Sequence, residues 1–178
     1  LRNPDNLVTG KAVVELLKSC APNIKDPWEI PNVDLDSILL AIRIATNSKT
    51  LATESVCTEC SQTNNNIIDL LELLQNVGVG NYDVPLPLNG LEIKFKPLSY
   101  KQVVEANKQQ IKAQEKIEKL NDAKNDDERI KLSSEIVKDL NGVSMALVSE
   151  AIEYIKTPDS VVFETDFIRE FLENSDKE

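Results

Sequence analysis

Two cysteines three positions apart are the residues of this sequence whose types and spacing best suit chemistry. Cys57 and Cys60 enclose Thr58 and Glu59, and two thiolates at this spacing can hold one side of a zinc ion. A structural zinc site needs four ligands, but the chain has no histidine and only one further cysteine, Cys20. We therefore interpret Cys57 and Cys60 as half of a zinc site whose other ligands lie outside this fragment or in a partner. No cofactor is expected in this fragment alone, and zinc is expected in a longer form of the protein.

Two other interpretations of this cysteine pair stay open. The residues can be two free thiols in a tight turn that hold no ligand. A catalytic redox role is the least favoured, because the pair does not open a helix after a buried strand, as it does in thioredoxin-like proteins. Cys20 falls on the apolar side of a predicted helix, so we expect it to be a small buried hydrophobic residue.

The rest of the sequence lacks the residue sets of common enzymes. Histidine, the commonest general base, is missing altogether. There is no glycine-rich phosphate loop, no nucleophile elbow and no Ser-His-Asp set. The acidic residues at 34, 36 and 126–128 suit the first turns of helices, where the helix dipole favours negative charge. We therefore expect a protein that is not an enzyme.

The composition limits the kinds of molecule that this protein is expected to bind. Of 178 residues, 41% are hydrophobic and 28% charged, as is typical of a soluble globular protein. The net charge of −10 argues against a nucleic-acid-binding surface, because phosphate binding needs clustered Lys and Arg. No apolar run approaches a membrane span, and no signal-like segment is present. The odd cysteine count fits a reducing compartment, and the start at Leu1 rather than methionine indicates a fragment or a processed form.

A β-hairpin near the middle of the chain is the clearest local signal. Asn89-Gly90 suits a type I′ turn, and it predicts antiparallel strands over Val84–Leu88 and Leu91–Lys96. The first of these strands contains two prolines, which cannot donate to a ladder, so it should lie at a sheet edge. In the second strand, three apolar residues should pack on helices: Leu91, Ile93 and Phe95.

The hairpin leads into a long predicted helix. Ser99 is placed to cap it, with Gln102 as its capping-box partner, and the helix should run to about Asn121. A narrow seam recurs every seven residues along it, formed by Val103, Ala106, Gln110, Ala113, Ile117 and Leu120. The seam either packs against the next helix as an antiparallel pair, or its outer part projects and docks on a partner. The charged residues beside it should stay in water: Lys108, Lys112, Lys116 and Lys119.

The other elements follow from periodicity and stop signals. Before the hairpin we predict a helix capped by Thr9, a deeply buried helix over Leu35–Thr46, strands over Lys49–Val56 and Thr63–Asp69, and a helical turn at Leu70–Leu74. After it we predict helices over Asp127–Leu140 and Ser144–Ile155, a strand at Val161–Phe163 and a last helix over Asp166–Asn174. The helix over 127–140 should carry four apolar residues on which the seam can pack as an antiparallel pair: Ile130, Ile136, Val137 and Leu140. The last helix should have an apolar face formed by Phe167, Ile168, Phe171 and Leu172.

These elements predict an α+β fold that is predominantly helical, with one or two small antiparallel hairpins. We divide the chain into a helical segment with the C-x-x-C hairpin, residues 1–82, and the central hairpin with its following helices, residues 83–178. Packing of the two segments as one domain is the alternative.

Five blocks of the sequence, in order, resemble a family of tailed-phage proteins, the T4-type baseplate hub and hub assembly proteins. They are LRNPDNLVTGKAV at Leu1–Val13, DLDSILLAIRIAT at Asp34–Thr46 with CTEC after it, GLEIKFKPLS at Gly90–Ser99, AIEYIKTPD at Ala151–Asp159, and FIREFLEN at Phe167–Asn174. The resemblance covers nearly the whole chain.

The resemblance implies a structural or assembly protein of a contractile phage tail, not an enzyme. Such a protein would promote baseplate hub assembly by contacting other hub proteins, as a minor hub component or an assembly chaperone. It would act in the host cytoplasm during assembly, and the virion tail is the second location that the resemblance implies. Nucleic acid and membrane are not expected as partners. The alternative function, from the cysteine spacing, is a zinc-ribbon-type regulatory or nucleic-acid-binding module.

Overall fold

The computed structural model describes residues 6, 8–78, 80–123 and 125–175. The helices are α2 Lys11–Cys20, the short 3-10 helix η1 Pro27–Glu29, α3 Asn32–Thr46, α4 Leu70–Gln75, α5 Tyr100–Asp122, α6 Asp126–Ala151 and α7 Thr165–Ser175. The strands are β1 Thr50–Val56, β2 Thr63–Asp69, β3 Leu86–Leu88, β4 Leu91–Phe95, β5 Ile152–Lys156 and β6 Val161–Val162. The predicted α+β class, mostly helical with small antiparallel sheets, is confirmed.

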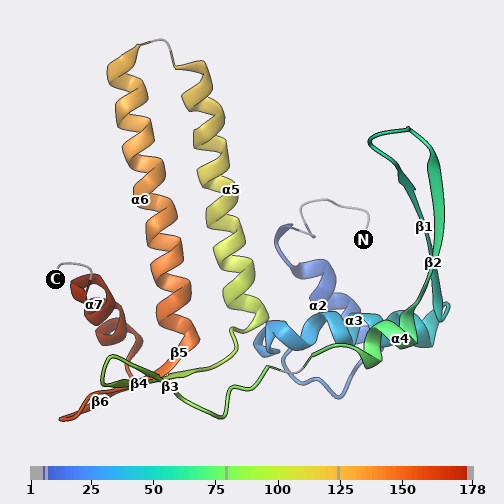
Figure 1. The fold of residues 1–178 in the computed structure, drawn as a ribbon, viewed down its shortest axis with the longest axis horizontal. Coiled ribbons are helices and arrows are strands. Elements are labelled where there is room, and N and C mark those ends of the chain that lie inside the picture. The colour runs from blue at the N-terminus through green and yellow to red at the C-terminus, as the bar shows by residue number, and fades with distance from the viewer. Residues whose placement is uncertain (1–5, 7, 79, 124, 176–178) are drawn as a thin grey trace.

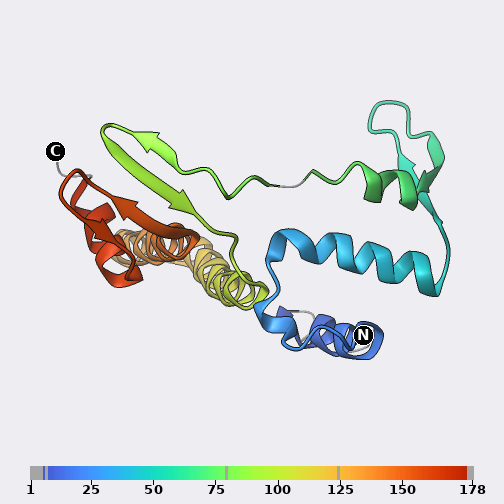
Figure 2. The same ribbon diagram turned by 90° about the horizontal axis from the view of Figure 1, so that it is seen from below.

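The molecule has two long arms that rise from a low base. The α5–α6 pair forms one arm and the β1–β2 ribbon forms the other, at the opposite end of the base (Figure 1). Seen from below, the four-stranded sheet and α7 lie under the helical arm, whereas α4 lies under the ribbon (Figure 2). The chain between α4 and β3 crosses the molecule as an extended segment.

The central hairpin is present as predicted. Strand β3 pairs with β4 antiparallel, and Asn89 and Gly90 take positive φ values of 49° and 83°, as a type I′ turn requires. The sheet order is β3-β4-β5-β6, so the proline-containing strand β3 lies at an edge. Ile93 is buried, and Leu91 and Phe95 pack against the same cluster.

Two hydrophobic clusters hold the base together. The first joins α2, η1, α3 and the start of α5, through Val14, Leu17, Ile30, Leu35, Tyr100 and Val104. The second joins the four-stranded sheet to α7, through Ile93, Ile152, Ile155 and Ile168. Because Tyr100 and Val104 belong to the first cluster, helix α5 connects the N-terminal helices to the rest of the fold.

The prediction of two helices after residue 127 is wrong. Helix α6 is continuous from Asp126 to Ala151, with Gly142 in its interior, and the residues from Ile152 form strand β5 instead. Helix α5 runs antiparallel beside α6 and buries Val143 next to the glycine, so packing offsets the weak helix propensity there. Strand β5 forms because β4 offers it a hydrogen-bonding edge.

Several predictions about burial in the first half are also wrong. Helix α2 follows Gly10, which has φ 74° and no side-chain cap, rather than being capped by Thr9. Cys20 is exposed at the last position of α2, not buried. Helix α3 is not among the most buried elements, because only Leu35 is fully buried in it. Its residues Ile38, Leu39 and Ile42 are half-buried and pack against the edge of the first cluster.

The two strands around the C-x-x-C pair are present where predicted. The ribbon β1–β2 is paired over all seven positions, from Thr50 with Asp69 to Val56 with Thr63. Asp69 then caps α4 by accepting hydrogen bonds from the backbone N–H groups of Leu71 and Glu72, at 2.8 and 3.2 Å.

Candidate protein-interaction surfaces

The chain exposes far more surface than a compact protein of its size. Its accessible surface is 13023 Å², whereas a compact monomer of 19.9 kDa exposes about 8,700 Å². The accessible surface thus exceeds that of a compact monomer by roughly 4,000 Å². The two arms stand apart from the base, and nearly all residues of the ribbon strands are exposed (Figure 1). Obligate interfaces bury about 2,000–5,000 Å² in total, so the excess is as large as a whole interface of that class.

The helical arm begins at a well-defined cap. Ser99 accepts a hydrogen bond from the backbone N–H of Gln102, and the Gln102 side chain accepts one from the backbone N–H of Ser99 at 2.7 Å. This is the capping box that the sequence predicts. It sets the direction in which α5 leaves the base.

Small residues allow α5 and α6 to lie close together. Ala106 and Ala113 are buried, and they face α6 residues that include Ile136 and Val143, which are also buried. The α5 seam therefore packs antiparallel against α6, which was one of the two predicted arrangements. Near the base, the seam is covered by α6 and does not project toward a partner.

An ion pair connects the two helices half-way along the arm. The Lys116 ammonium lies 2.6 Å from Asp139 and 3.7 Å from Glu135, both on α6. The hydrogen bond to Asp139 is the main cause that raises the pKa of Lys116. Of the four lysines predicted to stay in water, Lys112 and Lys119 are exposed, whereas Lys108 and Lys116 are half-buried and form ion pairs.

The opposite side of α6 carries an uncovered apolar stripe. Ile130, Val137 and Val148 are 69%, 57% and 47% exposed. Their spacing of 7 and 11 residues is close to whole numbers of helical turns, so they share one face over about 27 Å. We call these three residues the outer stripe of α6. Ile130 and Val137 were predicted as residues on which the α5 seam could pack. This prediction is wrong, because both are exposed, whereas Ile136 and Val143 of α6 are buried.

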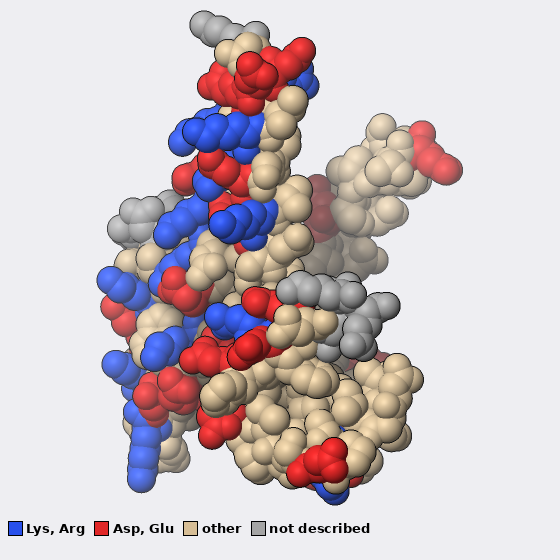
Figure 3. All heavy atoms as spheres, turned by 90° about the vertical axis from the view of Figure 1, so that its left-hand side faces the viewer, with Lys and Arg blue, Asp and Glu red and all other residues tan. Residues whose placement is uncertain are grey.

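The seven-residue spacing of Ile130 and Val137 can be read from the sequence. The sequence does not show whether these two residues face α5 or solvent. Uncharged residues separate the members of the outer stripe, including Ser134, Asn141 and Ser144. On the face formed by α6 and α7, Lys and Arg side chains alternate with Asp and Glu, without a patch of one sign (Figure 3). The outer stripe is therefore a narrow apolar line on a helix that also carries charged residues of both signs.

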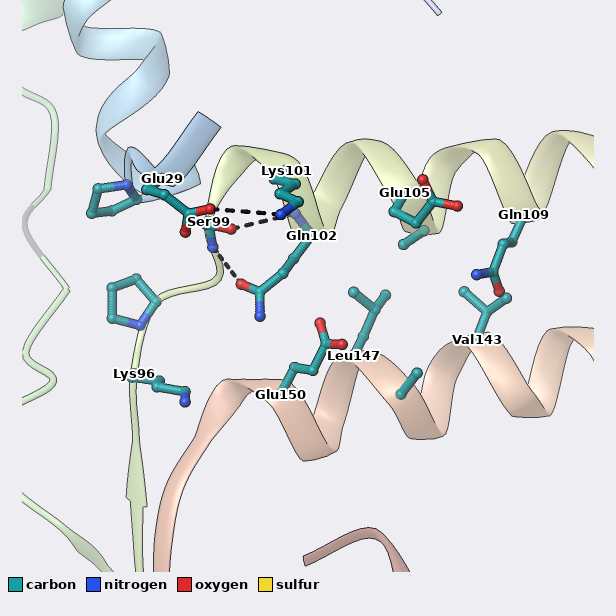
Figure 4. A pocket seen from close by; sticks show the side chains of 14 residues that line it. Glu29, Lys96, Ser99, Lys101, Gln102, Glu105, Gln109, Val143, Leu147 and Glu150 are labelled. Atoms are coloured by element: carbon teal, nitrogen blue, oxygen red, sulfur yellow. Dashed lines mark hydrogen bonds and ion pairs between the residues drawn. The ribbon is translucent and has the colours of Figure 1, made fainter. Parts of the chain in front are cut away.

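A pocket of about 600 Å³ lies where α5 and α6 diverge toward the base. Gln102 and Gln109 of α5 point toward α6, which carries Val143, Leu147 and Glu150 on the facing side, and Lys96 lies beside this end of α6 (Figure 4). The one hydroxyl of the lining, on Ser99, already takes part in the capping box. The lining contains no nucleophile paired with a base.

A second hollow, of about 760 Å³, lies between the edge of the sheet and α7. It is lined by Leu88, Leu91 and Ile93 of the hairpin and by Phe167 and Phe171 of α7, among others. Phe167 belongs to the predicted apolar face of α7 but is 61% exposed, whereas Ile168 is buried and Phe171 and Leu172 pack against the second cluster. The sequence pattern alone could not locate this hollow.

The C-x-x-C pair lies at the tip of the ribbon arm. The loop is closed by two backbone hydrogen bonds of 2.9 Å, from Cys57 N–H to Gln62 O and from Ser61 N–H to Cys57 O. The Cys57 sulfur accepts hydrogen bonds from the backbone N–H groups of Cys60 and Glu59, and these lower the pKa of Cys57 below that of an ordinary thiol. Cys57 is half-buried and Cys60 is exposed.

The structure brings Cys57 and Cys60 together but adds no third ligand. Within residues 6, 8–78, 80–123 and 125–175, no group of three or more His, Cys, Asp or Glu side chains is arranged to hold a metal ion. Cys20, on α2, is therefore not part of such a group. Over the same residues, none of the helices combines the length and apolarity that crossing a bilayer requires.

These features define the class of the protein: an arm-bearing scaffold whose uncovered surfaces suit contacts with other proteins. A family model described as the T4 bacteriophage base plate protein matches residues 2–178, so the chain belongs to this family. It is thus related to structural proteins of the phage tail baseplate. No curated protein and no solved structure matches the chain.

Proposed function

We propose that this protein promotes assembly of the baseplate hub by binding other hub proteins, as a minor hub component or an assembly chaperone. The observation that supports it is the excess of roughly 4,000 Å² over the surface of a compact monomer. Two arms exposed to water have no evident use in a protein that works alone. In an assembly, neighbouring proteins cover such arms. The protein acts in the host cytoplasm while the tail is built.

The helical arm is the part that best fits this role. Its outer stripe is apolar and uncharged, and about 27 Å of it is long enough for a partner helix to lie along it. Three apolar side chains on a narrow stripe form a small contact, which suits reversible binding more than self-association. The mixed charges beside the stripe contribute steering and orientation more than affinity.

Two other functions receive less support. A zinc-ribbon-type regulatory or nucleic-acid-binding module needs a basic surface, but the chain carries a net charge of −10 and its charges alternate on the face of Figure 3. An enzyme would need a convergent set of polar groups, and the pocket of Figure 4 lacks a paired nucleophile and base.

The proposal is tested by placing charges on the outer stripe. The double substitution Ile130→Asp and Val137→Asp should leave the fold intact, because both side chains are exposed, and should abolish hub assembly. A matched control, Gln114→Asp with Asn121→Asp, adds the same two charges at exposed positions of α5 and should assemble normally. Folding is measured by thermal unfolding, and assembly by co-purification of hub proteins from infected cells. Normal assembly of the stripe variant would remove the outer stripe from the proposal.

A further inference from the structure

We propose that strand β2 of the ribbon arm binds an extended segment of a partner protein that carries Lys or Arg, and that this segment adds a third strand to the ribbon. Backbone hydrogen bonds hold the added strand, and its cations match the carboxylates of this part of the chain. The surface is separate from the outer stripe of α6, and the inference does not depend on the proposed role in hub assembly.

The ribbon has two open edges. Its sheet consists of β1 and β2 alone, and no other strand of the described residues pairs with either of them. The ribbon stands at the end of the base opposite the helical arm (Figure 1). Thirteen of its fourteen strand residues are exposed, and Thr53 alone is half-buried. A two-stranded ribbon by itself is marginally stable in water, so a third strand would stabilise it.

The register of the ribbon determines which backbone groups of β2 face outward. In an antiparallel ladder, hydrogen-bonded pairs alternate with pairs whose N–H and C=O groups point away from the partner strand. At the tip, the Cys57 N–H donates a hydrogen bond of 2.9 Å to the Gln62 carbonyl oxygen, and the register runs unbroken from there to the base. Thr63, Asn65 and Ile67 occupy the alternate positions of β2, so their backbone groups point away from β1.

Strand β2 lacks the features that usually prevent an edge strand from pairing, such as proline, lysine or a β-bulge. In the other sheet, Pro87 of the edge strand β3 has no N–H to donate. Strand β2, which is described along its whole length, contains no proline, no charged side chain before Asp69 and no break in register. Its Ile67 is 78% exposed. Strand β1 carries Glu54 at its middle, so β2 is the edge better suited to pairing.

The charge of this part of the chain indicates what the added strand carries. Between Thr50 and Ile93 the sequence has six acidic residues and no Lys or Arg. Two of the carboxylates belong to the ribbon arm, and both Glu54 and Glu59 are exposed. Such charges attract and orient a partner of opposite sign. A second copy would bring the same carboxylates and a nucleic acid would bring phosphates, so both are repelled, whereas a basic protein segment is attracted.

The experiment uses the whole chain and, as the probe, a synthetic peptide with blocked ends in which Lys alternates with Val. We expect the peptide to bind at low salt and to bind more weakly as the salt concentration rises. In the complex, the amide N–H groups of Thr63, Asn65 and Ile67 should exchange with deuterium at least about tenfold more slowly, as measured by NMR. The amide of Ala52, which faces outward on β1 opposite Ile67, should exchange as before.

Two control peptides separate pairing from charge. The Lys–Val peptide N-methylated at every residue keeps its charge but cannot form a strand ladder, so it should not slow the three amides. A peptide in which Glu replaces Lys can form a ladder but has the wrong charge, and it should not bind.

A matched pair of substitutions tests the edge itself. Asn65→Pro removes an outward N–H from the middle of β2 without removing a hydrogen bond to β1, and it should abolish peptide binding. Ala52→Pro makes the same change on the outer edge of β1 and should leave binding unchanged. The exchange measurement on the unsubstituted chain needs neither variant, so it decides the matter even where a proline loosens the ribbon.

Four results would overturn the proposal. Absence of binding at low salt, or binding that leaves the three β2 amides unchanged, would exclude this edge. Equal slowing by the Glu–Val peptide would exclude charge as the basis of selection. Light scattering that shows a dimer, with these amides already protected before peptide is added, would make a second copy the occupant. None of these outcomes bears on hub co-purification by the stripe variant, so the two proposals fail separately.

Discussion

The rings of Trp28 and Tyr100 stack with their centroids 5.7 Å apart and their planes inclined by 16°. Trp28 belongs to η1, and Tyr100 is the first residue of α5. The Tyr100 hydroxyl also donates a hydrogen bond of 3.5 Å to the Gly10 carbonyl oxygen, and burial raises the pKa of this tyrosine. Tyr100 is therefore one of the side chains, with Val104, that attach the helical arm to the N-terminal helices.

Removing that attachment should destabilise the protein strongly. We expect Tyr100→Ala to lower the free energy of unfolding by about 3–5 kcal/mol, because a buried aromatic side chain and its stacking are lost. Tyr100→Phe keeps the ring and loses only a long hydrogen bond, so it should cost about 0.5–1.5 kcal/mol. Urea denaturation of the two variants measures the difference. Equal losses in both would mean that the hydroxyl, not the ring, anchors α5.

Two glycines should respond to alanine in opposite directions. At Gly10, φ is 74° and an added Cβ would lie 2.9 Å from Val104 Cγ2, so Gly10→Ala should destabilise by at least about 1–2 kcal/mol. At Gly142, inside α6, an added Cβ meets nothing within 4 Å, so Gly142→Ala should stabilise by about 0.5–1 kcal/mol. Thermal unfolding of the pair checks both signs. A loss of stability at Gly142 would contradict the continuous helix α6.

Leu86 and Ile93 are cross-strand partners in the central hairpin. Ile93 lies on the buried strand, and Leu86 lies on the exposed edge strand. Ile93 is 8% exposed and packs in the cluster with Ile168, so Ile93→Ala should cost about 2–5 kcal/mol. Leu86→Ala, at a 58% exposed position on the same face, should cost less than about 1 kcal/mol. Denaturant midpoints of the two variants test this. Similar costs would place the edge strand inside the core.

The ion pair of Lys116 with Asp139 should stabilise the packing of α5 on α6 at neutral pH, and this stabilisation should be lost in strong base. The folded-state pKa of Lys116 is raised, so its contribution is fully present below the usual pKa of lysine and is lost as the pH rises through the folded-state value. A double-mutant cycle with Lys116→Met and Asp139→Asn, repeated from neutral pH to about pH 11, measures the coupling. If the coupling energy between Lys116 and Asp139 does not fall as the pH rises, the two side chains interact through packing and not through charge.

Local chemistry determined much of this fold before any tertiary contact was known. The Asn89-Gly90 turn, the capping box of Ser99 with Gln102 and the two strands around the C-x-x-C loop all appear where their residues predict them. Each of these depends on groups a few residues apart, so a stretch of sequence contains all the atoms involved. The cysteine pair is local in the same sense, and its spacing alone marked it as a candidate ligand pair.

Tertiary structure decided what lies far apart in the chain. Gly142 looked like a helix end, but α5 packs along α6 and keeps the helix continuous. Ile130 and Val137 share a heptad pattern with core residues, yet the alanine seam of α5 covers the other face and leaves them outside. Cys20 lies on an apolar pattern and is exposed, since no element covers that end of α2 in the described chain. Burial depends on which surfaces meet, and a one-dimensional pattern shows only which residues are able to meet.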